Sequence, residues 1–290
     1  LYPDNIVKNK DNYTFVINNE KYYFTIYNRD IAEIDTIFKL NREMIERNSL
    51  VHEIILNKKN EPLTLVDGVY YILLRVYVND AKIISIDDIL FMLNSNDSIM
   101  DNNIIGRTDW VKLWSLKIDY FEYQIGHLIK KYPYIYNTVD YYIGLGENAI
   151  EYIKELSEEK MNTNLSVTHR RIGANSTLFD LYNPLNLVID YKVRDIAEYI
   201  KDVFFNSDID VYKILNELFS KAIFDKPTLS LLFSRLLFPS YYFDLYENIL
   251  EMDLNENIIL NIIKKSTSYE KFLYFLMQNW SLYKIEWLVK

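Results

Sequence analysis

Glycine limits what this chain can fold into more than any other residue, because only 6 of its 290 residues are glycine. A loop that cradles phosphate needs glycines where backbone N–H groups come close to the anion, and no glycine precedes Gly68. The sequence contains no GxxxxGK(S/T), GxGxxG or GxSxG motif. It therefore excludes the P-loop, Rossmann and nucleophile-elbow sites that depend on these motifs.

Charge and cysteine content exclude further classes of site. The chain carries 32 Lys and Arg against 41 Asp and Glu, a net charge of −9, so we expect its surface to repel nucleic acid. The absence of cysteine excludes disulfides, thiolate metal sites and a cysteine nucleophile. The most apolar windows, at residues 69–78 and 229–238, are shorter than the ~18 to 20 apolar residues of a membrane span. We expect neither a membrane span nor a secretory leader.

The first 80 residues predict a β-rich unit with one helix. Residues 13–27 alternate apolar and polar side chains around Asn18 and Asn19, which is typical of a β-hairpin. Residues 29–47 keep the apolar spacing of a helix, with Asp30 placed to cap its start. Two further strands are predicted at residues 51–56 and 69–78, joined across a turn at Asp67 and Gly68.

From about Asn79 the pattern becomes helical. Helices are predicted at residues 86–93, 109–131, 139–158, 194–205, 209–222, 228–238, 241–252, 255–264 and 269–289. The exception is residues 165–190, where two β-like runs, LSVTH and NLVID, flank a loop. A small β-rich N-lobe, residues 1–79, followed by a large helical C-lobe, residues 80–290, is the arrangement of an α+β, bilobal protein-kinase-like fold. Such an arrangement does not by itself imply function.

In that fold the segment between the two β-like runs would line the cleft. His169, Arg170 and Arg171 follow the first run, and Asp190 ends the second. One interpretation is a phosphoryl-transfer site, in which a loop residue handles the nucleophile and Asp190 holds Mg²⁺. The alternative is structural: His169 hydrogen-bonds the backbone of the loop, and Asp190 caps or pairs within the lobe.

Several segments of the large lobe carry a resemblance to a known family. They are Asp109-Trp110 with Trp114 and Glu122, YYIGLGENAIEYI at 141–153, VTHRRI at 167–172, LVIDYKVRDIAEYI at 187–200 and SRLLFPSYYFDLYE at 234–247. On these segments the chain resembles the spore-coat kinase-like proteins of the Firmicutes, the CotS and YutH group, which are distant relatives of aminoglycoside phosphotransferases and choline kinases. The resemblance implies an aminoglycoside phosphotransferase-like fold.

The resemblance also implies which residues would form the site. In the phosphotransferase relatives the catalytic loop resembles HGDxxxxN, whose Asp is the base and whose Asn helps to hold Mg²⁺. His169 matches, but Arg171 stands at the position of that Asp and Ser176 at that of the Asn, with Asn175 one place early. Asp190 matches the metal-binding Asp. By resemblance, Asp195 matches the structural Asp that follows it.

The N-terminal part departs from the relatives as well. They place a nucleotide-gripping Lys near the end of the second or third strand, where this chain offers Thr25, with Lys21 before it. A helix Glu such as Glu43 would then have no evident Lys to pair with. Losing a general base usually costs 10²- to 10⁴-fold in rate, about 3 to 5 kcal/mol of barrier, and an arginine cannot take up the proton.

These departures predict a degraded phosphotransferase site, and hence a spore-coat-associated pseudokinase that acts by binding or scaffolding. ATP and Mg²⁺ are expected cofactors only if the site is active. Arg170, with Ser176 and Asn175, would hold a nucleotide or a phosphorylated small molecule, and spore-coat proteins are further candidate partners, in the cytoplasm or the spore coat. Two alternatives stay open: an active ATP-dependent phosphotransferase with an unconventional base, acting on a small molecule or a protein, and a purely structural coat component.

Overall fold

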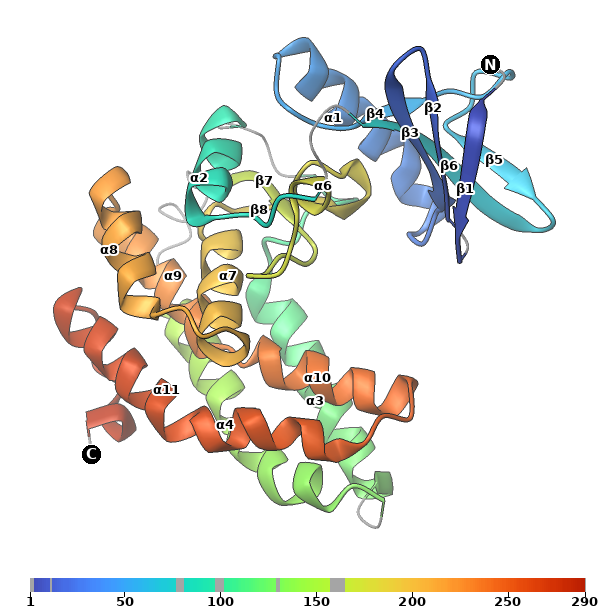
Figure 1. The fold of residues 1–290 in the computed structure, drawn as a ribbon. Coiled ribbons are helices and arrows are strands. Elements are labelled where there is room, and N and C mark those ends of the chain that lie inside the picture. The colour runs from blue at the N-terminus through green and yellow to red at the C-terminus, as the bar shows by residue number, and fades with distance from the viewer. Residues whose placement is uncertain are drawn as a thin grey trace. The chain divides into compact units, whose positions relative to one another are not determined.

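The structure is a computed structural model that describes residues 3–10, 12–76, 81–96, 102–128, 131–156 and 165–289. The chain divides into two compact units, Leu1–Gly106 with Leu165–Asp190, and Arg107–Asn164 with Tyr191–Lys290. The strands gather in the first unit and the long helices in the second (Figure 1). The expected α+β class is confirmed. The lobe boundary near Asn79 lies outside the described residues, so the division into residues 1–79 and 80–290 stays a prediction.

The first unit contains an antiparallel six-stranded sheet in the order β1-β2-β3-β6-β4, with β5 paired to β6. The strands are β1 (Asp4–Asn9), β2 (Asn12–Ile17), β3 (Glu20–Ile26), β4 (Glu53–Ile55), β5 (Leu63–Val66) and β6 (Val69–Val76). The predicted hairpin is β2–β3. Asn18 and Asn19 have φ of 51° and 64°, the left-handed values that a two-residue hairpin turn requires.

The turn at Asp67 and Gly68 leads into β6, as predicted, but the strand before the turn is β5 and not the predicted strand at residues 51–56. Asp67 has φ of 50° and Gly68 of 81°, and they connect β5 to β6, whereas β4 pairs with β6 without a direct turn. Neither β5 nor β1 is predicted from the sequence, because β5 has only 4 residues and β1, DNIVKN, is mostly polar. Both depend on pairing with a neighbouring strand for their stability.

The first unit also contains several helices and a two-stranded sheet. Asp30 caps the one-turn helix η1 (Ile31–Glu33), accepting from the Ala32 amide at 2.9 Å, and α1 (Ile34–Glu46) follows directly. The two strands predicted around the loop are confirmed as β7 (Leu165–His169) and β8 (Leu187–Tyr191), which pair with each other. Further short elements are α2 (Ile86–Ser95), α6 (Leu178–Leu181) and η3 (Pro184–Asn186).

The second unit is helical throughout its described residues. Its elements are α3 (Trp110–Leu128), α4 (Pro133–Lys154), α7 (Val193–Asn206), α8 (Val211–Lys221), α9 (Lys226–Leu237), α10 (Ser240–Glu251), η4 (Glu256–Ile259), α11 (Leu260–Asn279) and η5 (Glu286–Val289). α3 packs on α4, and α9 packs on both α4 and α7. No helix in the described part of the chain is both long enough and apolar enough to cross a membrane.

Two helix boundaries differ from the predicted ones. Pro133 opens α4 at its first turn, the one helical position where a missing N–H costs nothing. The helices predicted at 255–264 and 269–289 are joined by the single helix α11, which begins at Leu260 and ends at Asn279; η4 precedes it and η5 follows it. The polar run at 266–268 resembles a break in the sequence, but the Ser266 hydroxyl donates to the Ile262 carbonyl at 3.1 Å inside the helix. The helix therefore continues through it.

Candidate functional site

Hydrogen bonds to Asn186 hold the backbone of the loop that follows β7, residues 170–177. The Arg170 amide donates to the Asn186 carbonyl at 2.7 Å, and the Arg171 amide donates to the Asn186 side-chain oxygen at 3.2 Å. The Asn186 side-chain amide donates in return to the Arg171 carbonyl at 2.7 Å. This β7 loop is thus fixed through main-chain groups, and its exposed residues are Arg170, Arg171 and Asn175.

His169 is almost completely buried, with 1% of its surface exposed. Its Nε2 lies 2.7 Å from the carbonyl of Leu181. Because a carbonyl can only accept, Nε2 carries the proton and donates it. This is the bond to the loop backbone that the structural interpretation of His169 predicts; a catalytic role for His169 stays a prediction.

The family resemblance predicts that Asp190 and Ser176 stand at the positions of the relatives' two metal-holding residues. Asp190 is fully buried at the end of β8, and Ser176 uses its hydroxyl oxygen to accept from the Gly173 amide at 3.0 Å. The other carboxylate of the segment, Asp180, caps α6 by accepting from the amide and the hydroxyl of Thr177 at 2.8 and 2.9 Å. In the described residues no three His, Asp or Glu side chains gather as metal ligands. A metal-binding role for Asp190 stays a prediction.

In the relatives the strand and helix that correspond to β3 and α1 carry the Lys and Glu that grip the nucleotide, and the resemblance predicts no such pair here. Thr25 on β3 donates its hydroxyl to the side chain of Asn12 at 2.6 Å. The buried face of α1 consists of Ile34, Ile37, Leu40, Asn41 and Met44, whereas Glu43 is exposed. Asn41 bonds the backbone around β4, donating to the His52 carbonyl at 2.8 Å. The inward face of α1 therefore carries an amide and no carboxylate.

The second unit holds a buried charged cluster, which sequence reasoning did not identify. The Glu198 cluster comprises Glu198 and Lys201 on α7, Arg235 on α9 and Ser240 on α10. Glu198 accepts from Lys201 at 2.9 Å, from Arg235 at 2.7 Å and from the Ser240 hydroxyl at 2.9 Å. The i, i+3 spacing of Glu198 and Lys201 is visible in the sequence, but the partners 37 and 42 residues away are not.

The pKa values of Glu198 and Lys201 are both lowered, for different reasons. Burial opposes ionisation of Glu198, but the positive charges of Lys201 and Arg235 outweigh it and hold the pKa of the carboxyl well below its usual range. Burial lowers the pKa of Lys201 to about 8, against the attraction of Glu198. Lys201 also donates to the carbonyls of Arg235 and Phe238, at 3.1 and 3.3 Å. The cluster is thus a buried ion network with several hydrogen bonds.

Aromatic side chains surround the cluster. The Arg235 guanidinium lies over the rings of Trp110 and Trp114, 5.1 and 5.7 Å from their centroids. Trp114 stacks on Phe238 at 4.4 Å. Trp110 meets Tyr191 edge-on at 4.9 Å. The segments at 109–114, 187–200 and 234–247, on which the family resemblance rests, thus meet in one packed region.

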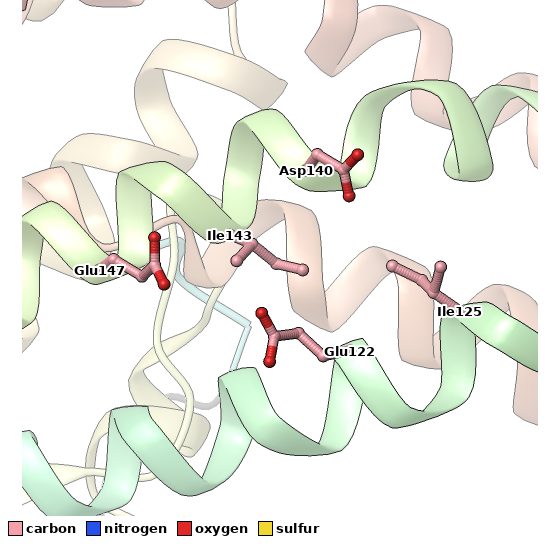
Figure 2. Close-up of a pocket in the computed structure, with 5 residues that line it drawn as sticks. All are labelled: Glu122, Ile125, Asp140, Ile143 and Glu147. Carbon is pink, nitrogen blue, oxygen red and sulfur yellow. The ribbon is translucent and has the colours of Figure 1, made fainter.

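An open pocket of about 410 Å³ lies between α3 and α4 in the second unit. Its lining residues are Glu122, Ile125, Asp140, Ile143 and Glu147. In Figure 2 the Glu122 carboxylate points from α3 toward α4, and Ile143 points from α4 into the same space. All three acidic side chains are exposed. Of these residues, only Glu122 was singled out from the sequence.

Comparison with known protein families and curated proteins extends these observations. A family model described as "Spore coat putative kinase YutH" matches residues 1–276. The endospore coat-associated protein YutH of Bacillus subtilis (strain 168) is 25% identical over 237 residues, which cover 75% of this chain and 70% of that protein. The resemblance inferred from the sequence is confirmed.

Solved structures share the fold. An aminoglycoside phosphotransferase from Alicyclobacillus acidocaldarius superposes with a TM-score of 0.67 at 10% identity, over 96% of this chain and 93% of that one. A spectinomycin phosphotransferase, solved with ADP and spectinomycin, gives a TM-score of 0.55 at 10% identity, over 87% and 84% of the two chains. The described architecture is thus the aminoglycoside phosphotransferase-like fold that the sequence predicts. By its family match over most of its length, this chain belongs to the spore coat putative kinase YutH family.

Proposed function

We propose that this protein is a pseudokinase, which keeps the phosphotransferase fold but does not transfer phosphate and acts by binding. The observation that carries this proposal is the exposed surface of the β7 loop, which consists of Arg170, Arg171 and Asn175. A general base in this loop needs a group that accepts a proton near neutral pH. Two guanidinium groups and an amide cannot do so. Arg171 stands where the relatives' catalytic motif has its Asp.

The other polar groups of the segment support the same conclusion. Asp180 already accepts two hydrogen bonds from Thr177 in a capping box. Ser176 accepts from the Gly173 amide, and the Nε2 proton of His169 is directed to a carbonyl. Each of these groups therefore has a structural task. Without the base, a loss of 10²- to 10⁴-fold in rate is expected, even if the nucleotide still binds.

Binding at the β7 loop would suit an anionic ligand. Each guanidinium carries five N–H donors in a planar fork that matches phosphate or carboxylate, and Arg170 and Arg171 are both exposed on a loop whose backbone is fixed. We propose a nucleotide or a phosphorylated small molecule as the ligand, held by Arg170 and Arg171 beside Ser176 and Asn175. Asp190 would contribute a metal ligand only if phosphoryl transfer survives.

The proposed setting is the spore coat. The B. subtilis relative is named as endospore coat-associated, and we propose that this chain acts in or around coat assembly, with coat proteins as its partners. A scaffolding protein in that setting needs a stable fold and a binding surface, whereas turnover is dispensable. A purely structural coat component would keep the fold and lose the ligand.

Calorimetric titration with ATP, with and without Mg²⁺, combined with an assay for ADP release, tests the proposal. We expect no Mg²⁺-dependent turnover from the wild type. Turnover that requires Mg²⁺ and disappears in Asp190→Ala, while the exposed-site control Asp208→Ala keeps it, would establish the active phosphotransferase instead. Binding of ATP or phosphate that is weakened in Arg170→Ala and Arg171→Ala separates a binding protein from a purely structural one.

A further inference from the structure

A strip of exposed apolar side chains follows the boundary between α8 and α11 in the second unit. This α8/α11 strip consists of Ile209, Tyr212, Phe219, Ile223, Tyr274, Phe275 and Tyr283. Their exposed fractions run from 37% for Phe219 and Tyr274 to 100% for Ile223. Single exposed apolar residues are ordinary on a protein surface, whereas a continuous group marks a surface of interaction.

Aromatic rings in and beside the strip touch across its elements. Tyr212 of α8 lies edge-on to Phe275 of α11, with ring centroids 5.1 Å apart. Phe219, two turns further along α8, lies edge-on to Trp280 at 5.6 Å and to Phe224 at 5.7 Å. Phe224 is the sequence neighbour of the fully exposed isoleucine. The rings therefore join the two helices and the loop after α8 into one surface.

The size of the strip matches what a stable protein interface needs. With about 150 to 250 Å² per aromatic side chain, the exposed fractions of the seven residues amount to roughly 700 Å². A standard interface buries about 800 Å² on each partner, and the largest apolar patch on a monomer is usually about 300 to 600 Å². The strip alone thus supplies most of one side of an interface.

The charges beside the strip nearly balance. The exposed ones in its segments are Lys213, Lys226, Lys271 and Lys284 against Asp208, Asp210, Asp225 and Glu286, four of each sign. Glu217 and Lys221, also beside it, form an ion pair with each other at 3.0 Å. A chain of net charge −9 repels an identical chain over most of its surface. The strip lacks such an excess of negative charge, so it does not oppose contact with the same surface of another copy.

We propose that the α8/α11 strip is a self-association surface, on which a second copy of this chain docks with its own strip about a two-fold axis. Such an isologous contact pairs one surface with itself, and homodimer interfaces are more apolar than other interfaces. The strip is defined by the second unit alone. The inference therefore goes beyond the pseudokinase proposal and does not depend on it.

Sedimentation velocity of the full chain over a concentration series tests the inference. We expect a dimer at micromolar concentrations. Ile223→Asp and Tyr283→Asp place a charge in the strip at its two most exposed positions, so they should weaken the dimer at least tenfold and leave the melting curve unchanged. Leu116→Asp, on α3, is the matched control at an apolar residue that is 57% exposed, and it should sediment as the wild type does.

Two results would overturn the inference. A wild type that stays monomeric up to about 100 μM, well above the expected dissociation constant, leaves the strip without a second copy. A dimer that survives both strip variants but dissociates in Leu116→Asp assigns the interface to α3. Loss of the dimer in each strip variant separately, with the fold intact by circular dichroism, supports the docking of strip on strip.

Discussion

The β7 loop and the Glu198 cluster differ in which of their groups form the hydrogen bonds described above. In the loop the backbone is fixed by Asn186, while the arginine side chains are exposed. In the cluster every side chain bonds to another side chain or to a carbonyl. Lys201 alone donates to Glu198, to two carbonyls and to the Ser240 hydroxyl. These bonds thus hold the backbone of the loop, whereas in the cluster they hold the side chains.

This difference bears on the proposal that the phosphotransferase fold is kept without its chemistry. The Glu198 cluster lies on α7, α9 and α10, whereas the β7 loop belongs to the other unit. A substitution in the loop changes what the surface can bind or catalyse, at little cost to folding. A substitution in the cluster is expected to lower the stability of the fold, because it leaves a buried charge without its partner.

Breaking the Glu198 cluster should have the largest effect. Glu198→Ala removes a carboxylate that Lys201 and Arg235 share and leaves two buried cations without this partner. Removing one partner of a buried ion pair costs about 3 to 5 kcal/mol, and we expect a loss of that size in the free energy of unfolding, measured in urea. A loss below about 1 kcal/mol would show that the network is not a main support of the unit.

The pH dependence of stability should report Lys201 next. Its pKa falls from 10.5 in the unfolded chain to about 8 in the folded one, so the unfolded chain binds more protons between these values. The free energy of unfolding should therefore rise with pH in that window. Buried tyrosines with raised pKa values, such as Tyr142 at about 12, act in the opposite sense only above about pH 10.

Urea unfolding at about pH 7, 8, 9 and 10 measures this effect. We expect a rise of about 1 to 2 kcal/mol across the upper two units for the wild type. Lys201→Met, which keeps the length of the side chain without its charge, should abolish the rise even if its overall stability is lower. An identical slope in the variant would assign the titration to another group.

Much of the fold could be predicted from local patterns. Alternation and turn residues indicate the β2–β3 hairpin and the β7 and β8 strands, and periodicity indicates most helices. The strands β1 and β5 were not predicted, because their stability comes from their pairing partners. The continuity of α11 was not predicted either, because the hydroxyl of Ser266 bonds within the helix. Such facts depend on contacts that no local window contains.

The candidate site shows the same division. The family motif predicts the positions of His169, Asp190 and Arg171, and one interpretation of the sequence predicts a bond from His169 to the backbone of the segment between β7 and β8. The acceptor at Leu181 and the support from Asn186 could not be predicted, because the loop backbone decides them. The Glu198 cluster could not be predicted from the sequence, because its members come from three helices that tertiary packing brings together.

A pair of glycines in α4 sharpens the contrast between packed and open positions. An alanine methyl at Gly144 would meet no atom within 4 Å, whereas at Gly146 it would lie 2.8 Å from Ile118 Cδ1 and 3.4 Å from Phe238. Replacing a helical glycine by alanine gains roughly 0.5 to 1 kcal/mol where there is room. We expect Gly144→Ala to stabilise, and Gly146→Ala to be at least about 1 kcal/mol less stable than Gly144→Ala, by thermal and urea unfolding. Equal effects would mean that α3 yields freely at this contact.

The smallest effect should come from the β7 loop itself. Arg171→Ala should change the free energy of unfolding by less than about 0.5 kcal/mol, because the side chain is exposed. Asn186→Ala removes the two side-chain bonds to the Arg171 backbone and should cost about 1 kcal/mol. If Arg171→Ala were as costly as Asn186→Ala, the arginine side chain would itself support the loop. Arginine at this position would then serve the fold, and its presence would no longer point to an anionic ligand.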